Sequence, residues 1–347
     1  MSSPSSPQPS TSSAPQSDEI AAVAAWIPQL ELALSEVIVG QESLVQSLTL
    51  GLLTGGHILL EGVPGLAKSL AVSCMAQAVH AQFNRLQFTP DLLPSDLVGT
   101  EIYNANSGEF TVRKGPIFAN FVLADEINRA PAKVQSALLE GMQEHQVSIG
   151  GTSFPLPSPF MVLATQNPIE QEGTYPLPEA QLDRFFFKID VPFPTLEELV
   201  EIMDRTTGNA QFEAKAVLTP QELIELRRIV REVPIAPEVV RYAMRLTLGT
   251  HAASDHGTAT ARQFLRWGAS PRGAQTLILG ARVQALLAGR LHASLQDVRK
   301  VALPALRHRI GLNFDAEAEG LTPDALVERV LDEVPEVESR VARELRQ

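Results

Sequence analysis

The sequence is poor in cysteine, in long apolar runs and in positive charge. Cys74 is the single cysteine among 347 residues, which excludes an internal disulfide and a cysteine-based zinc site; we expect it to be a small buried residue. No apolar run reaches about eighteen residues, so no transmembrane helix is predicted. Lys and Arg number 28 against 40 Asp and Glu, a net charge of -12. No basic patch or stripe is visible, which argues against nucleic acid as a partner.

The first residues, 1–18, are rich in Ser, Pro and Gln and lack the charged start and apolar centre of a secretory signal. We expect a disordered tail there and a cytoplasmic protein. His251 and His256 lie five residues apart, a spacing that fits no zinc signature, so both are predicted to be surface residues.

The most informative segment reads Glu61-Gly62-Val63-Pro64-Gly65-Leu66-Ala67-Lys68-Ser69. It has the character of a phosphate-binding loop, because an apolar run precedes it and a helix-like run beginning at Leu70 follows it. Backbone N–H groups of such a loop point at phosphates, and the helix N-terminus adds partial positive charge. Lys68 is expected to reach the β- and γ-phosphates, and the Ser69 hydroxyl to ligate Mg²⁺.

One position departs from the usual phosphate-loop pattern. Ala67 stands where the second glycine is expected, and a methyl group is tolerable there only if the backbone does not need a positive φ. The competing interpretation is a plain Gly-Pro turn between a strand and a helix. The acidic and polar residues described below favour the phosphate loop.

Five short apolar runs alternate with helical segments through the first half of the chain. This pattern predicts an α/β fold with a parallel sheet and helices on both faces. Two hairpin signals interrupt it, one around Asn104–Gly108 and one around Gly150-Gly151. After Pro192-Phe193-Pro194 only helical periodicity appears. We therefore predict a nucleotide-binding α/β domain over 19–193 and an all-helical domain over 194–347. The five predicted strands are His57–Glu61, Phe83–Thr89, Phe121–Glu126, Phe160–Gln166 and Phe185–Val191.

Two carboxylates follow the third apolar run. Asp125 and Glu126 are expected beside the phosphate loop, since ligands bind at the carboxyl ends of parallel strands. Asp125 would hold the Mg²⁺ shell, and Glu126 would act as general base for the attacking water. An exposed acidic turn is the alternative for this pair taken alone. Asn167 follows the fourth run and could orient the water, although an Asn-Pro turn explains this residue better when it is taken alone.

Two arginines complete the candidate site. Arg184 lies before the fifth run, at the domain edge, where an arginine can reach a neighbouring subunit's phosphates; a plain surface Asp–Arg pair is the alternative. Ser270-Pro271 is a helix-start signal that would hold Arg272 toward the nucleotide, whereas a solvated arginine near a cap is the alternative.

Together these residues resemble the MoxR family of AAA+ ATPases. Glu61 to Ser69 resembles its Walker A motif, in which alanine at position 67 is normal, and Asp125-Glu126-Ile127-Asn128-Arg129-Ala130 resembles Walker B. Asn167 matches sensor 1, Arg184 the arginine finger and Arg272 sensor 2, and Val39-Gly40-Gln41 resembles the segment beside adenine. The run from Glu172 to Phe185 is the most distinctive match, and the two hairpins match the family's insertions.

The resemblance implies an ATP hydrolase that uses Mg²⁺, with a P-loop core followed by a helical lid. It implies a homo-oligomer, commonly a hexameric ring, with ATP between subunits. It also implies a chaperone-like motor that matures or activates protein complexes, with a client and in some cases a partner carrying a von Willebrand factor A domain. The implied nucleotide contacts are Val39, Gly40, Gly62, Val63, Pro64, Gly65, Leu66, Ala67, Lys68, Ser69 and Leu70.

Other functions remain possible on the same core. A nucleic-acid-dependent AAA+ motor is the main alternative, although the acidic charge argues against it. A non-hydrolysing nucleotide switch is disfavoured by Glu126, Asn167 and Arg184, since a switch needs no activated water. A kinase fits the helical domain and the hairpins poorly.

Overall fold

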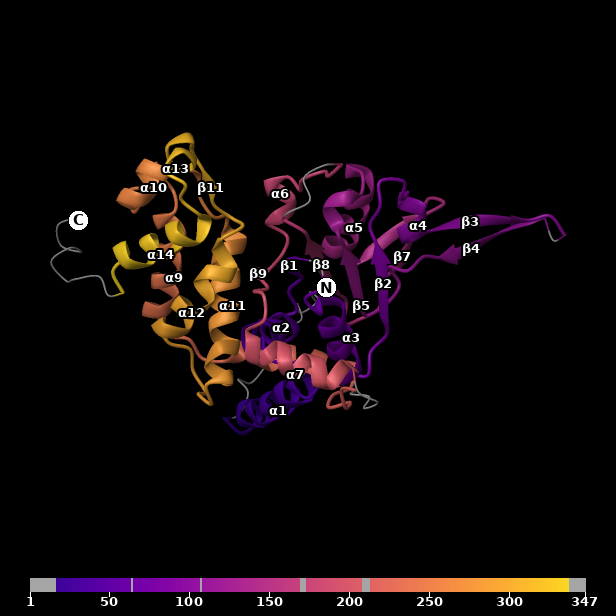
Figure 1. Cartoon of the computed structure of the whole chain (residues 1–347), viewed down its shortest axis with the longest axis horizontal. Helices are drawn as coiled ribbons and strands as arrows, with labels where there is room; N and C mark the ends of the chain where they lie inside the picture. The colour runs from indigo at the N-terminus through magenta and orange to yellow at the C-terminus, as the bar shows by residue number, and fades with distance from the viewer. Residues whose placement is uncertain (1–16, 64, 107, 169–172, 208–212, 337–347) are drawn as a thin grey trace, which may run out of the picture.

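The computed structural model describes residues 17–336 except 64, 107, 169–172 and 208–212. Figure 1 shows a helical part formed by roughly the last third of the chain, a central sheet with its helices, and a hairpin that projects from the side opposite the helical part. Residues 1–16 of the predicted tail lie outside the described residues, and helix α1 (Ser17–Ser35) begins directly after them. No helix in the described part of the chain is long and apolar enough to cross a membrane.

Five parallel strands form the central sheet, in the order β2-β5-β8-β1-β9. Each strand comes from one of the five predicted apolar runs, so the predicted parallel sheet is confirmed. The strands are β1 (Ile58–Glu61), β2 (Phe83–Gln87), β5 (Phe121–Asp125), β8 (Met161–Gln166) and β9 (Phe187–Asp190).

Helices cover both faces of this sheet. Those on one face are α1, α2 (Glu42–Thr54) and α3 (Lys68–Ala78), and those on the other are α4 (Pro94–Val98) and α5 (Ala132–Glu144). Leu60 and Leu163 pack toward the first set, and Leu59 and Val162 toward the second. This follows from the strand geometry, in which successive side chains point to opposite faces. Cys74 is buried in α3, as predicted.

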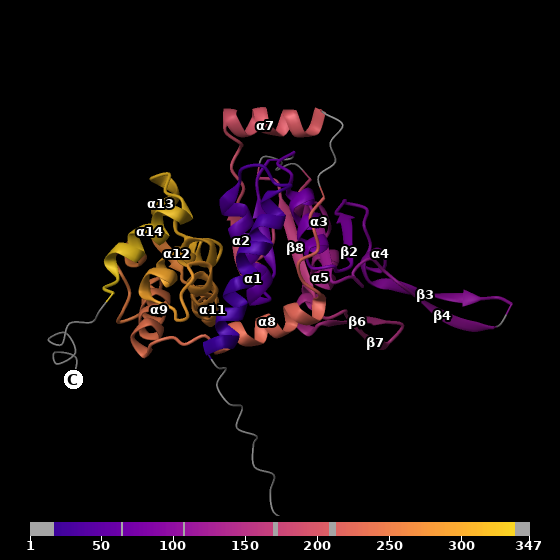
Figure 2. The same cartoon turned by 90° about the horizontal axis from the view of Figure 1, so that it is seen from below.

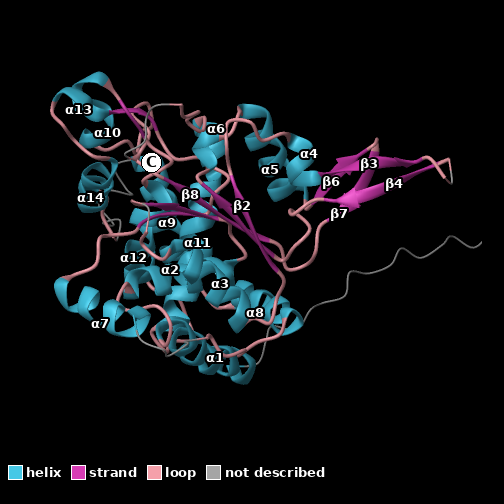
Figure 3. Cartoon of the chain, turned by 45° about the vertical axis from the view of Figure 1, so that its right-hand side comes forward, coloured by secondary structure: helices cyan, strands magenta, loops and turns pink. Residues whose placement is uncertain are grey.

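Two antiparallel hairpins leave the core at the predicted places. Strand β3 (Gly99–Asn104) pairs with β4 (Glu109–Lys114), and β6 (Gln146–Ile149) pairs with β7 (Thr152–Pro155). Figure 3 shows both reaching out on the same side of the molecule, the first one farther. Gly99 is required at the base of the longer hairpin, because a Cβ there would lie 2.2 Å from a backbone oxygen of β4.

The C-terminal part is mainly helical, as the sequence pattern predicts, but one detail of that prediction is wrong. Strands β10 (Leu265–Trp267) and β11 (Gly311–Leu312) pair antiparallel, and they are too short to produce a period of two in the sequence. The remaining helices are η1 (Ile127–Arg129), α6 (Glu179–Leu182), α7 (Leu196–Thr207), α8 (Pro220–Glu232), α9 (Pro237–Gly249), α10 (Ala259–Phe264), α11 (Pro271–Leu287), α12 (Leu295–Leu306), α13 (Phe314–Ala318) and α14 (Pro323–Glu333).

The sheet and the helical part share one hydrophobic cluster, which runs from α1 and α2 through β9 into α11 and α12. Phe187, Leu277 and Val301 are fully buried members of it. Figure 2 shows α7 lying across one end of the core, apart from the other C-terminal helices. The limits 19–193 and 194–347 stay a prediction; the boundary between them falls in the loop between β9 and α7.

Candidate nucleotide-binding site

The predicted phosphate loop joins β1 to the first residue of α3. Gly65 has a φ of 86° and a Cβ there would meet nothing within 4 Å, so the backbone conformation and not space favours glycine. Ala67 is the N-cap of α3 with φ 54° and ψ 18°. The condition derived from the sequence, that this position avoids a positive φ, is therefore not met. A left-handed conformation costs an L-residue roughly 1–2 kcal/mol.

Lys68 begins α3 with its side chain folded back over the loop. Its Nζ donates to the Gly62 carbonyl at 2.6 Å, and only 8% of the residue is exposed. Burial lowers the pKa of this ammonium, while the charges of Asp125 and Glu126 act in the opposite direction. A phosphate oxygen could take the place of the carbonyl, because the ammonium group carries three donors.

Asp125 ends strand β5 and is held from the two neighbouring strands. The Thr165 hydroxyl donates to its Oδ1 at 2.6 Å, and Arg85 of β2 donates to its Oδ2 at 2.6 Å. Because β2, β5 and β8 run parallel and adjacent, their carboxyl ends bring these side chains to one edge of the sheet. This edge also borders the phosphate loop, as the sequence predicted.

Glu126 follows with a left-handed backbone, φ 56°. The Thr165 hydroxyl accepts a hydrogen bond from its N–H at 2.8 Å, so one threonine fixes both acidic residues. The Glu126 carboxylate accepts from Gln87 at 2.8 Å and from Arg129 at 3.0 Å. It is therefore aimed by two side chains from different elements.

A cavity of about 340 Å³ lies between the loop and the acidic pair. Asn167, at the end of β8, forms part of its wall and is 7% exposed. The cavity thus brings together the predicted cation, the two carboxylates and the predicted water-positioning amide. Its lining residues are Gly65, Leu66, Ala67, Lys68, Ser69, Arg85, Gln87, Asp125, Glu126, Thr165 and Asn167.

A second, more apolar cavity of about 450 Å³ adjoins the other side of the loop. The predicted adenine-side residue Val39 and the predicted contact Leu70 line it, and Ile202 of α7 closes it from outside. Gly40 does not line it; a Cβ at Gly40 would lie 2.0 Å from the Glu198 carboxylate of α7. The two cavities share Gly65, Leu66 and Ala67, so a base in one and phosphates in the other would span the loop.

Two predicted contacts in the described part of the loop, Gly62 and Val63, do not line either cavity. Gly62 supplies the carbonyl that accepts from Lys68, and Val63 packs against the hydrophobic core. Pro64 lies outside the described residues.

The donor set fits Mg²⁺ that arrives with a phosphate chain. Within the described ranges no group of three His, Cys, Asp or Glu side chains could hold a metal alone. The predicted ligands Ser69 and Asp125 line the same cavity, and Mg²⁺ commonly uses one or two protein oxygens plus phosphates and water. Arg85 already binds one Asp125 oxygen, so direct ligation through that oxygen requires Arg85 to turn away.

Arg184 and Arg272 lie together, away from the loop of their own chain. Both line a third cavity, of about 200 Å³, whose wall includes His57 at the start of β1. The phosphate loop follows the opposite end of that strand. The Arg184 guanidinium donates to the Leu139 carbonyl at 2.7 Å. Ser270 caps α11 and Pro271 takes its first position, as the sequence predicted.

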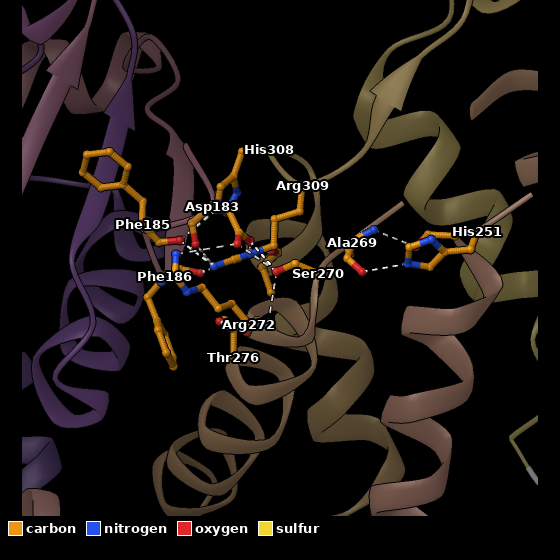
Figure 4. Close-up of polar contacts among 12 residues, drawn as sticks. Asp183, Phe185, Phe186, His251, Ala269, Ser270, Arg272, Thr276, His308 and Arg309 are labelled. Atoms are coloured by element: carbon orange, nitrogen blue, oxygen red, sulfur yellow. Dashed lines mark hydrogen bonds and ion pairs between the residues drawn. The ribbon is translucent and has the colours of Figure 1, made fainter. Parts of the chain in front are cut away.

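Several residues of the site were missed from the sequence. Arg85 and Gln87 are polar residues in a strand, and alternation alone could have placed both on the face of Asp125. Thr165 is a lone hydroxyl in an apolar strand. Arg205 lines the apolar cavity from α7 and gave no local signal. The surface prediction for His251 and His256 is wrong, because both residues are half-buried. The His251 ring bonds the Ala269 carbonyl at 2.9 Å (Figure 4).

Comparison with known proteins agrees with this geometry. A family model for the ATPase family associated with various cellular activities (AAA) matches residues 57–187, and an AAA lid domain model matches residues 258–330. A crystal structure of a proposed ATPase from Cytophaga hutchinsonii superposes with a TM-score of 0.85 at 45% identity, covering 92% of this chain and 97% of that one.

Curated relatives extend the similarity over nearly the whole chain. Chaperone MoxR1 of Mycobacterium tuberculosis is 50% identical over 315 residues, which cover 90% of this chain and 83% of the relative. Protein MoxR of Paracoccus denitrificans is 32% identical over 324 residues, covering 88% and 94%. The α/β core, the helical part and these relatives lead to one conclusion: the chain belongs to the MoxR-type proteins of the AAA ATPase family.

Proposed function

We propose that this protein binds MgATP and hydrolyses it to ADP and phosphate. Lys68 binds the β- and γ-phosphates, and Ser69 and Asp125 hold Mg²⁺, which supplies charge compensation at the phosphates. Glu126 takes a proton from the attacking water, and Asn167 orients that water. The apolar cavity beside Val39 and Leu70 receives the base.

The observation that carries this proposal is the 340 Å³ cavity, which is lined both by Lys68 and by the carboxylates of Asp125 and Glu126. A cation beside two aimed carboxylates suits a triphosphate, its metal and a water. Arg129 and Gln87 keep the Glu126 carboxylate in one place, which a general base requires because proton transfer needs hydrogen-bond reach.

We further propose that the site is completed by a neighbouring subunit. Arg184 and Arg272 lie across the sheet from their own loop, and β1 alone spans roughly 13 Å at about 3.3 Å per residue. A head-to-tail assembly would instead bring both arginines to the next subunit's phosphates, and such interfaces close into rings. The proposed assembly is a hexamer, with hydrolysis dependent on it.

The proposed work is chaperone-like, on a protein client in the cytoplasm. The name of the Mycobacterium relative, a chaperone, supports this, and a partner with a von Willebrand factor A domain belongs to the same proposal. The exposed β3–β4 hairpin is the candidate element for passing motion to the client. A nucleic-acid motor has no observation in its favour, and DNA or RNA should not stimulate turnover.

Glu126→Gln tests hydrolysis. Turnover should fall at least about 100-fold, since general-base catalysis contributes roughly 10²–10⁴, while the affinity for MgATP should stay within a few-fold. The matched control is Glu140→Gln, which changes a glutamate of helix α5 that does not line the cavity. Phosphate release and fluorescent-nucleotide titration measure the two quantities. Turnover equal to the control would remove Glu126 from its proposed role.

A further inference from the structure

Asp183, the residue before the proposed arginine finger, receives side chains from the helical part of the molecule (Figure 4). The Arg309 Nε donates to its Oδ1 at 2.9 Å. The Ser270 hydroxyl lies 2.8 Å from both of its oxygens, and an Arg272 nitrogen lies 3.9 Å away. One carboxylate therefore connects Arg184 along the chain to Arg272 through space.

The Arg309 side chain, which binds this carboxylate, is buried and fixed by hydrogen bonds. Only 5% of the residue is exposed, and all five of its N–H groups have acceptors. These acceptors are the Asp183 side chain and carbonyl and the carbonyls of Phe185, Phe186 and Ala305. Burial lowers the pKa of Arg309 to about 10, so the guanidinium stays charged at neutral pH. Next to it, the His308 ring bonds the Phe185 carbonyl at 2.9 Å.

Arg309 thus donates hydrogen bonds to backbone carbonyls on both sides of Arg184. These acceptors belong to residues 183, 185 and 186. Arg309 itself lies in the turn that follows α12, and it also donates to the Ala305 carbonyl within that helix. A planar guanidinium with every donor used tolerates little displacement. A movement of α12 must therefore carry the chain around Arg184 with it.

Ser270 ties the second arginine to the same point. Its hydroxyl donates to Asp183 and accepts from the Arg272 N–H at 3.1 Å, which caps α11. The start of α11, and with it Arg272, is therefore fixed to the carboxylate that Arg309 holds.

We propose that Asp183 and Arg309 are positioning residues that join Arg184 and Arg272 into one rigid unit, which the helical part presents to the neighbouring subunit's nucleotide. This inference rests on the proposed function and adds to it: neither residue touches the nucleotide of its own chain, and both act through the arginines. Movement of the helical part then changes both arginine contacts together.

A purely structural ion pair is the competing explanation, and the position of the defect in mixed rings distinguishes the two. Lys68→Ala subunits have a defective loop but intact arginines, and Arg184→Ala subunits have the reverse. In a random equal mixture about a quarter of head-to-tail interfaces combine an intact loop with an intact finger. ATP turnover of this mixture should therefore rise toward about a quarter of the wild-type rate.

The test variants are Asp183→Asn and Arg309→Lys. We expect each to hydrolyse ATP at least 10-fold more slowly than wild type, with a nucleotide affinity that changes less than threefold. Mixed with Lys68→Ala subunits, each should recover like Arg184→Ala. Mixed with Arg184→Ala subunits, neither should recover, because both partners are defective in the same half of the site.

A second variant and a matched control guard against simple misfolding. Ser270→Ala removes only the bridging hydroxyl and should give a smaller loss with the same mixing behaviour. Asp297→Asn removes a buried carboxylate paired to Arg290 at the start of α12. It should lower the thermal midpoint but keep turnover within twofold of wild type.

Each outcome has one meaning. Recovery with Lys68→Ala and none with Arg184→Ala supports the positioning role. In a second outcome, turnover recovers when Arg184→Ala is mixed with Lys68→Ala but does not recover when Asp183→Asn or Arg309→Lys is mixed with Lys68→Ala. This outcome overturns the positioning role and leaves the proposed function standing. Recovery of the test variants with Arg184→Ala also overturns it. Absence of recovery when Arg184→Ala and Lys68→Ala are mixed overturns the shared site itself, and the inference with it.

Discussion

At the scale of single residues, the nucleotide loop contains a conformation that its side chain does not favour. Ala67 has φ 54° at the start of α3, whereas glycine adopts this region without penalty. The loop is therefore strained at the residue that precedes Lys68 and helix α3. Gln41 and Glu126 have similar backbone angles, φ 51° and 56°, so left-handed residues recur around the two adjoining cavities.

Ala67→Gly should stabilise the protein. Relief of the left-handed strain exceeds the entropy that glycine loses on folding, and we expect a gain of roughly 0.5–1 kcal/mol in the free energy of unfolding. Urea unfolding without nucleotide measures it. Ala137→Gly, within helix α5, is the matched control and should lose about 1 kcal/mol. A loss at both positions would show that Ala67 is not strained.

His57 should make stability fall in mild acid. Burial is the main cause that lowers its pKa from 6.5 to about 4; its Nδ1 accepts from Val162 N–H at 2.9 Å, and the other ring nitrogen bonds the Met142 carbonyl. Between pH 6.5 and 4 the unfolded chain binds a proton that the folded ring does not. The free energy of unfolding should therefore drop by about 3 kcal/mol across this window and no further below it.

The comparison for this pH effect uses His57→Asn, which keeps an acceptor for the Val162 N–H and cannot take up a proton. Urea unfolding from pH 7 to 4.5 should show a smaller acid loss for this variant than for wild type. The exposed His292→Asn is the control and should follow the wild-type curve. Equal slopes for all three proteins would contradict the assignment to His57.

At the scale of elements, the sequence predicts what depends on local pattern. The five parallel strands, both hairpins and the Ser270 cap follow from apolar periodicity and turn residues. The strands β10 and β11 were missed because two or three residues carry no periodicity. Arg205 lines the apolar cavity only because α7 packs beside the loop in the folded chain, so it could not be predicted from the sequence. The Arg309 contacts likewise depend on residues more than 120 positions apart, which no local pattern encodes.

The packing of α11 depends on a glycine in its middle. A Cβ at Gly280 would lie 3.3 Å from Phe187 of β9 and from Val301 of α12. Gly280→Val should therefore cost about 2 kcal/mol of unfolding free energy by overpacking. Gln275→Val, at an exposed position of the same helix, is the control and should stay within roughly 0.5 kcal/mol. Urea unfolding measures both; equal stability of the two variants would indicate that the neighbours move aside.

At the scale of the whole molecule, the two predicted domains are not independent bodies. Separate domains are usually crossed by few contacts, yet one hydrophobic cluster here contains Leu30 and Leu52 beside the sheet and Leu277 and Leu326 in the helical part. Arg309 adds charged contacts across the same junction. The proposed nucleotide loop and the two arginines at the opposite end of β1 are thus linked through a continuous packed core.

The two tryptophans test this continuity, because Trp26 lies in α1 and Trp267 in β10. Trp26→Phe leaves Trp267 as the single fluorescent reporter, in the helical part. Trp267→Phe leaves Trp26, on the sheet side. Their urea transitions should coincide, since a shared core unfolds as one cooperative unit. Saturating ATP should shift both midpoints upward together, because a ligand that binds only the folded state stabilises all that unfolds with it. Two separated midpoints, or a shift confined to the Trp26 reporter, would mean that the parts unfold independently and that movement of the helical part is not transmitted through packing.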